Sequence, residues 1–291
     1  MAQNGREIRK RIASVANTQK ITSTMEMVAT AKLRRAQGQV LGSGPYFDGL
    51  RRLMGELAQH EIDLSLFPLF ESREVKRELI LTVTSNRGLC GGFNTNLISL
   101  ARKTIDADEA AGREIEFHVA GRKGIQAFGF AGVPMAATYT DFPERPTYDD
   151  AERVSRILVD PFLKGEVDAV KIVYAHFETM GRQPPTVTTL LPVGGDAVSD
   201  EGDGSSTQVI FEPSEEEILA ELVPLYVSNV VFRVLLESVA SEQVARRQAM
   251  KRASDNAEEM VKTLTLQFNK ARQAQITQEL GEIMGGVEAL K

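Results

Sequence analysis

The stretch Glu212–Leu290 constrains the fold most, because its pattern predicts one long helix. Residues 225–280 contain neither proline nor glycine. Apolar and small residues recur every three or four positions from Leu222 to Ala271, which is the period of an amphipathic helix. At about 1.5 Å per residue, such a helix would form a rod about 100 Å long. A rod of that length needs a partner helix or a partner protein to cover its apolar side.

The bulk composition is typical of a soluble globular protein. The chain has 291 residues, enough for one large or two ordinary domains. Its only cysteine, Cys90, excludes an internal disulfide and a cysteine-based metal cluster. No run of about 18 apolar residues predicts a membrane span. The basic N-terminus lacks the apolar core of a signal peptide, and we interpret it as the first helix rather than as a transit peptide.

Charge is distributed unevenly along the chain. Residues 1–40 carry eight Lys and Arg against two Glu, whereas residues 141–221 carry about twelve more acidic than basic side chains. A basic helix could bind nucleic acid or an anionic membrane, or it could simply be a solvated face. It could also complement an acidic protein partner. The charges alone leave these readings open.

Residues 3–57 form a second predicted long helix, and the cluster Gly42–Pro45 predicts a break or kink in it. Two long helices at opposite ends of a chain, with a compact insert between them, suggest an antiparallel pair. The heptad positions of the first helix begin apolar and then include polar and small residues: Ile8, Ile12, Val15, Gln19, Thr22, Glu26, Ala29 and Leu33. That seam is poor for a self-sufficient coiled coil and suits a helix that also faces a third surface.

The insert alternates between strands and helices, which predicts an α/β layer with a mainly parallel sheet. The polar, glycine-rich segment 194–208 reads as an exposed loop. We expect three regions: 1–60 as the N-terminal coiled-coil helix, 70–208 as an α/β domain, and 209–291 as the C-terminal helix paired with the first. The predicted strands are 78–84, 114–120, 169–176 and 186–193, and the predicted helices are 94–108, 121–130 and 148–163.

Two glycine-containing turns are candidates for phosphate binding. Ser85–Asn94 follows the first strand and opens a helix, a position that binds phosphate in many α/β proteins. The stretch nevertheless matches neither common nucleotide-binding pattern and has no lysine. A tight strand-to-helix turn explains it as well, and the weaker match Gly121–Gly124 has the same explanation.

No recognisable active site is assembled in the sequence. Cys90 could be a nucleophile at a helix N-terminus, but such a site also needs a base. The histidines His60, His118 and His176 lie far apart and in no metal-binding or catalytic motif. On the terminal helix, Glu242 and Arg246 fall on one face, and residues 269–279 carry few large apolar side chains. That end would be either solvent-exposed or enclosed by a partner.

Three blocks of sequence carry a resemblance to a known family. The blocks are Ile8–Thr22 with its continuation Met25–Ala29, then Arg87–Asn94, and finally Ala240–Gln243 with Met250-Lys251, Asn269–Gln273 and Ile276–Leu280. They reach from one end of the chain to the other, and they resemble the gamma subunit of the F-type ATP synthase, the central rotor shaft.

The resemblance implies a fold and a mechanism. The terminal helices would form an antiparallel coiled coil, the shaft, with an inserted Rossmann-like α/β domain as its foot. The shaft would turn inside a hexamer of three alpha and three beta subunits, and the foot would lie beside the epsilon subunit and the membrane ring of c subunits. ATP would be made on beta, so this chain would be non-catalytic, with no cofactor and no nucleic-acid partner.

The resemblance also implies roles for individual residues. Arg272 and Gln273 match residues that contact a catch loop on beta, and Thr277 and Glu279 match positions linked to coupling. Met25 matches a coupling position that faces the acidic lever of beta.

Glu242 and Arg246 match the partners of Met25 on the second helix. A looser match places foot contacts with the c ring around Phe211 and Glu212.

Together with the absence of a clear presequence, the resemblance implies a peripheral protein on the cytoplasmic side of a bacterial inner membrane. The extra cysteine-bearing segment of the chloroplast relatives is missing, and Cys90 alone excludes switching by an internal disulfide. Two alternatives remain at this stage: a nucleotide-binding α/β enzyme with its site at Gly88–Gly92, and a basic coiled-coil protein that binds nucleic acid.

Overall fold

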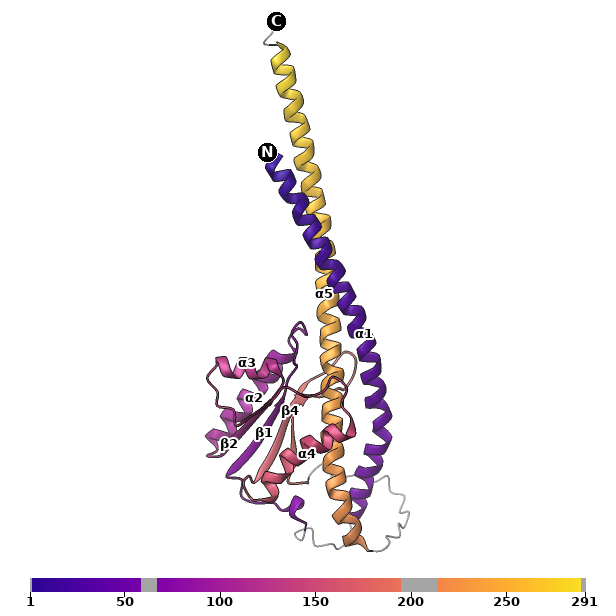
Figure 1. Ribbon diagram of the computed structural model, residues 1–291, viewed down its shortest axis with the longest axis vertical. Helices are drawn as coiled ribbons and strands as arrows, with labels where there is room; N and C mark the ends of the chain where they lie inside the picture. The colour runs from indigo at the N-terminus through magenta and orange to yellow at the C-terminus, as the bar shows by residue number, and fades with distance from the viewer. Residues whose placement is uncertain (1, 59–66, 195–213, 289–291) are drawn as a thin grey trace. The chain divides into compact units, whose positions relative to one another are not determined.

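The computed structural model describes residues 2–58, 67–194 and 214–288. A five-stranded α/β domain is inserted between two long helices, α1 and α5 (Figure 1). The elements are α1 (Ala2–Ala58), the 3-10 helix η2 (Pro68–Phe70), β1 (Arg77–Val83), α2 (Phe93–Ala110), β2 (Glu114–Ala120), α3 (Arg122–Phe130), β3 (Ala137–Tyr139), α4 (Tyr148–Leu163), β4 (Ala169–Ala175), β5 (Pro185–Leu191) and α5 (Glu215–Glu288).

The predicted elements are confirmed with small shifts at their ends, and two short ones were missed. No sequence pattern predicted η2 or the three-residue strand β3. The predicted break at Gly42–Pro45 is wrong, because α1 runs through it with Pro45 inside the helix. The residues after Pro45 are held by tertiary packing: Phe47, Leu50 and Met54 lie in or against the main core, which offsets the cost of an internal proline.

The described chain divides into two compact units. Residues 31–245 form one unit, and residues 1–30 with 246–291 form the other. Each long helix therefore contributes to both units. The three-region division predicted from the sequence stays a prediction, since its boundaries fall mainly at residues 59–66 and 195–213, outside the described ranges.

The sheet of the first unit has the strand order β3-β2-β1-β4-β5. β1 pairs in parallel with both β2 and β4, and β2 pairs in parallel with β3. β5 is antiparallel to β4. The expectation of a mainly parallel sheet is confirmed. All residues of β1 after the first are buried, as expected for a central parallel strand covered on both faces.

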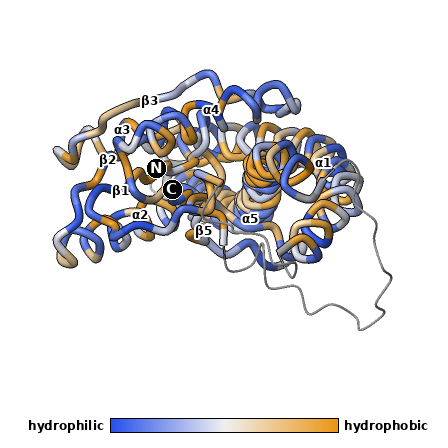
Figure 2. The backbone as a smooth tube through the Cα atoms, turned by 90° about the horizontal axis from the view of Figure 1, so that it is seen from below, coloured by the Kyte–Doolittle hydropathy of each residue, from blue (hydrophilic) through white to orange (hydrophobic). Residues whose placement is uncertain are grey.

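Helices cover both faces of the sheet, and successive residues of β1 point to opposite sides. Ile80 packs with α2 and α3 in one core cluster, whereas Leu79 and Leu81 pack with α4, α1 and α5 in the other. Hydrophobic residues lie along the strands and along α5 (Figure 2). The domain is thus a doubly wound layer in which α5 replaces part of the usual helical cover.

Within residues 31–245, α1 and α5 lie side by side and run in opposite directions (Figure 1). Phe47 of α1 stacks on Tyr226 of α5, with ring centroids 6.0 Å apart. By length and composition alone, α5 is apolar enough to cross a membrane. Its buried apolar residues account for that composition, since Leu219, Val223 and Val227 belong to the core of this unit.

In the second unit, the inward residues follow the predicted heptads. The heptad positions of α1 from Ile8 to Ala29 are all buried or half-buried, although they include Gln19, Thr22 and Glu26. The facing positions of α5 are also mostly small or polar. They are Arg246, Met250, Ala253, Ala257, Val261, Leu264, Phe268, Ala271 and Gln275. The weak apolar seam seen in the sequence is therefore the actual inner surface of this unit.

Candidate functional site

The carboxyl edge of the sheet is where a doubly wound fold binds nucleotides, at the point between β1 and β4 where the strand order reverses. Here α5 occupies that edge. The Ser241 hydroxyl donates to the backbone carbonyl of Ala175, at the end of β4, at 3.0 Å. The space left beside β1 is about 50 Å³, lined by Thr84, Phe142 and Glu242 among others. A nucleotide needs about 300 Å³ or more, so this crevice cannot hold one.

The turn Ser85–Asn94 is a compact structural turn. The Asn94 side-chain carbonyl accepts from the Ser85 backbone at 3.0 Å, and its amide lies 3.2 Å from the Cys90 sulfur. Cys90 is buried, and the Ser85 hydroxyl lies 3.7 Å from its sulfur. The backbone donors of this turn are thus partly used internally, and its thiol is not presented to a substrate.

The second glycine turn also has a packing explanation. Gly121 has a φ of 96°, and a side chain there would bring its Cβ within 2.2 Å of the Thr84 carbonyl oxygen. Gly124 donates its backbone N–H to the Thr84 hydroxyl at 2.9 Å. Both glycines therefore let α3 approach the end of β1 closely.

The two described histidines are engaged in separate polar groups. His118 lies between Glu116, at 3.0 Å, and the Tyr139 hydroxyl, at 3.2 Å. His176 Nδ1 lies 2.5 Å from a carboxylate oxygen of Glu237 on α5. His60 is outside the described residues. Neither described histidine forms a hydrogen bond with Cys90, so the nucleophile hypothesis gains no support.

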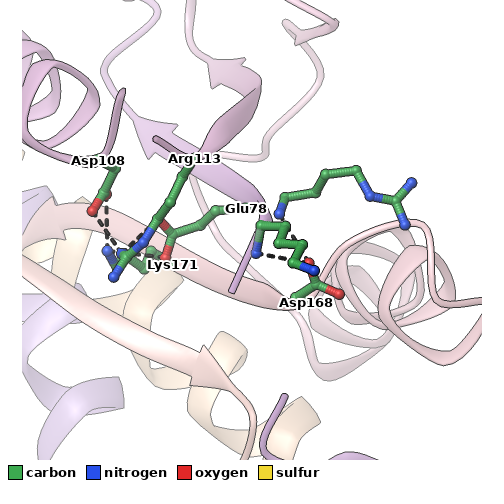
Figure 3. Close-up of polar contacts among 7 residues, drawn as sticks. Glu78, Asp108, Arg113, Asp168 and Lys171 are labelled. Carbon is green, nitrogen blue, oxygen red and sulfur yellow. Dashed lines mark hydrogen bonds and ion pairs between the residues drawn. The ribbon is translucent and has the colours of Figure 1, made fainter. Parts of the chain in front are cut away.

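A buried ionic cluster lies among β1, α2 and β4 (Figure 3). Lys171 Nζ is 2.9 Å from both Glu78 and Asp108, and Arg113 is 2.8 Å from Asp108 and 3.5 Å from Glu78. Two acids and two bases balance in charge. Burial raises the pKa of Glu78; burial acts the same way on Asp108, but hydrogen bonds from Lys171 and Glu78 lower the pKa of Asp108 overall. We interpret this group, the Glu78 cluster, as structural.

Asp168 caps the start of β1 beside this cluster (Figure 3). Its carboxylate accepts from the backbone nitrogens of Arg77, at 2.9 Å, and Lys76, at 3.0 Å. These bonds, the one from Arg77 first, hold the pKa of Asp168 below its ordinary value. The charged form is the one that fixes the entry of β1 into the sheet.

The last part of α5 presents the predicted tip residues on an exposed helix. Arg272, Gln273, Thr277 and Glu279 are all exposed. The Thr277 hydroxyl donates to the Gln273 carbonyl at 3.0 Å, and Glu279 accepts from the Gln275 side chain at 2.9 Å. These contacts are local to the helix. The guanidinium of Arg272 and the amide of Gln273 remain accessible to a partner.

The other predicted positions lie further along the two helices. Met25 on α1 is half-buried, and Arg246 on α5 is buried at 9% exposure; both belong to the unit of residues 1–30 and 246–291. Glu242 belongs to residues 31–245 and lines the small cavity at the end of β1. The predicted c-ring positions Phe211 and Glu212 lie outside the described residues.

Sequence reasoning missed Glu237, whose side chain is 1% exposed and binds both His176, just after β4, and Arg233 on α5 itself. A signal was present. Glu237 is an acid inside the largely apolar run 234–240, four residues after Arg233 on the same helix face. A charge in such a run is buried only with a partner, which should have marked it.

Comparisons with known proteins agree over the whole chain. A family model described as ATP synthase matches residues 4–290. The ATP synthase gamma chain of Gemmatimonas aurantiaca is 43% identical over 288 residues, covering 99% of each chain. That of Leptospira biflexa is 40% identical over 285 residues, covering 98% of each chain.

Solved structures show the same fold at low identity. A chain of the Euglena gracilis mitochondrial ATP synthase, from its OSCP/F1/c-ring assembly, matches with a TM-score of 0.69 at 18% identity, covering 100% of this chain and 95% of that one. A chain of the rotor of the same enzyme matches with a TM-score of 0.67, covering 95% and 100%. With the family model and the bacterial relatives, these findings establish that this chain belongs to the ATP synthase gamma-chain family.

Proposed function

We propose that this chain is the central rotor shaft of an F-type ATP synthase. It couples ion-driven rotation of the c ring to ATP synthesis or hydrolysis on the beta subunits of an alpha3-beta3 hexamer. The chain itself is non-catalytic and uses no cofactor. This proposal follows the names of its relatives and agrees with the filled crevice at the carboxyl edge of its sheet.

One observation carries the proposal: α5 continues past the N-terminal end of α1 (Figure 1). From residue 276 to residue 285 every side chain is exposed. This stretch includes large apolar side chains, with Ile283 64% and Met284 72% exposed. An isolated helix of this kind gains little stability by itself, because most helical stability in proteins comes from packing. A surrounding partner would supply that packing.

The tip residues fit intermittent contact with such a partner. Arg272 and Gln273 offer a bidentate donor and an amide to a polar loop, and we assign them to a catch loop on beta. Thr277 and Glu279, one turn further along, are assigned to coupling. Polar contacts at an exposed surface can form and break as the shaft turns, which a large apolar interface would resist.

The coupling group further down comprises Met25, Glu242 and Arg246. We propose that Met25 faces the acidic lever of beta and that Glu242 and Arg246 support it from α5. The basic first helix gives that surface the complementary sign, since Arg9, Lys10 and Lys20 are exposed. Only contacts that differ among the three beta subunits can shift their binding equilibria.

The α/β domain is the proposed foot, beside the epsilon subunit and the c ring. The relatives named above are bacterial, and we place this chain on the cytoplasmic face of the inner membrane, as a peripheral subunit. The two terminal helices would form the coiled coil of the shaft. No nucleic-acid partner is needed to explain the basic helix.

Co-purification tests the assignment directly. The tagged chain, extracted from its own membranes with mild detergent, should carry alpha and beta subunits at three copies each. Recovery without a stoichiometric hexamer would refute the proposal. Saturable micromolar nucleotide binding to the isolated chain would instead favour the enzyme alternative.

A substitution at Met25 tests the coupling group. Met25→Lys adds a positive charge to the basic surface of α1. We propose that this surface faces the acidic lever of beta. We expect proton pumping per ATP hydrolysed to fall, measured in inverted membrane vesicles, with Met25→Leu as the uncharged control. Pumping that stays proportional to hydrolysis in the lysine variant would contradict the role of Met25.

A further inference from the structure

A buried glutamate on α5 is bound by the end of a sheet strand. Glu237 has a side chain that is 1% exposed. One of its oxygens, Oε2, lies 2.5 Å from His176 Nδ1 and accepts from the Phe177 backbone N–H at 3.3 Å. His176 and Phe177 directly follow β4. One half of the carboxylate is therefore attached to the α/β domain.

The other half of the same carboxylate is attached to the helix pair. Oε1 of Glu237 accepts from Arg233 Nε at 2.7 Å, one turn earlier on α5. The Arg233 guanidinium lies over the Phe47 ring of α1, 4.5 Å from its centroid. Such a cation–π contact is favourable where the ring is partly desolvated. A single carboxylate thus connects the end of β4, α5 and α1.

A second attachment lies one turn further along α5. The Ser241 hydroxyl donates to the Ala175 carbonyl at 3.0 Å, and Ser241 is fully buried. We call these five residues, Phe47, His176, Arg233, Glu237 and Ser241, the Glu237 clamp. The clamp holds one face of α5 to the end of β4 at two successive turns.

The hydrogen bonds of the clamp oppose rotation about the α5 axis more than the surrounding apolar contacts do. Hydrophobic burial depends on area and has little preference for direction, so it resists separation more than it resists rolling. Hydrogen bonds weaken steeply when their angles change. A buried carboxylate is also costly to leave without its hydrogen-bond partners. Two such attachments on one helix face oppose rotation of the α/β domain about the α5 axis.

We propose that the Glu237 clamp is the torsional attachment through which torque passes between the α/β domain and the α1–α5 helix pair, with Glu237 as its positioning residue. This rests on the proposed rotor function. Tyr174 lies beside the clamp, and burial first, and then the Glu237 carboxylate, raise the pKa of Tyr174 to about 12. Its ring also packs edge-on against His176, at 6.3 Å between centroids.

A matched control exists in the same unit. Glu78 is also 1% exposed and is also bound by two bases, Lys171 and Arg113. Both of these bases lie in the α/β domain rather than on α1 or α5. Removing either glutamate disturbs a buried ionic group of this unit. Only Glu237 lies on the proposed path of torque.

The experiment compares Glu237→Leu, Glu237→Gln and Glu78→Leu in the complete enzyme. Glutamine can still accept from Arg233 and donate to His176, and it loses only the long bond from the Phe177 backbone N–H, so it keeps most of the geometry without the charge. ATP hydrolysis and ATP-driven proton pumping are measured in vesicles, and unloaded hydrolysis in the detached catalytic portion. Thermal unfolding of each enzyme reports the purely structural cost.

We expect Glu237→Leu to lower the protons pumped per ATP at least threefold, with unloaded hydrolysis within twofold of the wild type. Glu237→Gln should recover most of the ratio. Glu78→Leu should lower thermal stability and leave the ratio normal. A normal ratio in Glu237→Leu, or an equal fall in Glu78→Leu, would overturn the proposal.

If Glu237→Leu does not assemble, Arg233→Met takes its place, because it removes the partly exposed guanidinium that links Glu237 to Phe47 and leaves Glu237 bound to His176. A ratio lowered about twofold would support the clamp, and an unchanged ratio would overturn it. Failure of the clamp is distinct from failure of the rotor function. Wild-type chain that does not co-assemble with alpha and beta refutes the function, whereas an assembled Glu237→Leu enzyme with normal coupling refutes only the clamp.

Discussion

The same helix, α5, lies in two different environments, and the contrast separates folding from function. In residues 31–245 its side chains are almost all buried or half-buried, and they share one core with α1, α4 and the sheet. In the unit of residues 1–30 and 246–291, its inner stripe mixes small and polar residues with a few large apolar ones, such as Met250 and Phe268, and past residue 275 the described side chains are exposed. The first part is stabilised from within the chain. The second leaves surface for a partner.

The difference teaches that a weak seam is not a defect when the partner lies outside the chain. Ala253, Ala257 and Ala271 on the inner stripe of α5 allow close approach but contribute little apolar area. Four experiments test this contrast.

The largest expected effect is on the core of residues 31–245. Val231→Asp places a charge at a position that is 1% exposed, and we expect it to lower the free energy of unfolding by about 4 kcal/mol or more. Ile276→Asp, at a 45% exposed tip position, should change it by no more than about 0.5 kcal/mol. Urea unfolding of the purified chain measures both. Similar losses in the free energy of unfolding at the two positions would contradict the contrast between the core and the tip of α5.

Truncation after Leu264 should separate stability from activity. The core of residues 31–245 is untouched, so its unfolding midpoint should not move. ATP synthesis in membranes should fall about tenfold, because a shaft without Arg272 and Gln273 loses the contacts that we propose to distinguish the beta subunits. A chain that ends at Leu280 keeps those residues and is the control. An unaltered synthesis rate after the longer truncation would contradict the tip assignment.

A smaller effect, dependent on pH, is expected at Asp168. Its folded-state pKa is depressed, so its contribution is present above the ordinary value of about 3.9 and is lost as pH falls through the folded value. Asp168→Asn should cost about 1 kcal/mol at pH 7, limited by partial solvent exposure, and less at pH 3. Urea titrations at both pH values measure this, with exposed Asp106→Asn as control. A cost that is larger at pH 3 than at pH 7 would contradict the depressed pKa of Asp168.

The smallest effect is a gain at Gly42 in α1. A Cβ added there meets nothing within 4 Å, so Gly42→Ala should raise the free energy of unfolding by about 0.5 kcal/mol. Gly121→Ala is the contrasting variant, because its positive φ and the nearby Thr84 carbonyl make a side chain costly. Urea unfolding measures both. A loss at Gly42 would mean that α1 needs flexibility there to pack.

Local patterns predicted most of the fold. The apolar run of β1 and the heptad spacing of α1 predicted the bounds of these two elements almost to the residue. This worked because the period of the apolar residues depends on which side of the element faces the core. β3 was missed because three residues carry too little pattern. The break predicted at Pro45 is wrong because tertiary packing overrides the local preference of proline.

The candidate site was predictable only in part. The tip and coupling residues came from resemblance, and their exposure agrees with a contact role but leaves each role a prediction. Glu237 could not be paired from sequence, since its partner His176 lies 61 residues away and meets it only through the fold.

Cys90 has a practical consequence for watching this molecule. It is the only cysteine in the chain and is 2% exposed, within a turn that is hydrogen-bonded around its sulfur. Thiol reagents should therefore label the native chain only when that turn opens, so the labelling rate reports local opening between β1 and α2. A cysteine introduced at Phe130, which is 97% exposed, would react first. Cys90 would therefore contribute little labelling of its own when a single optical probe is attached to an introduced cysteine on the α/β domain.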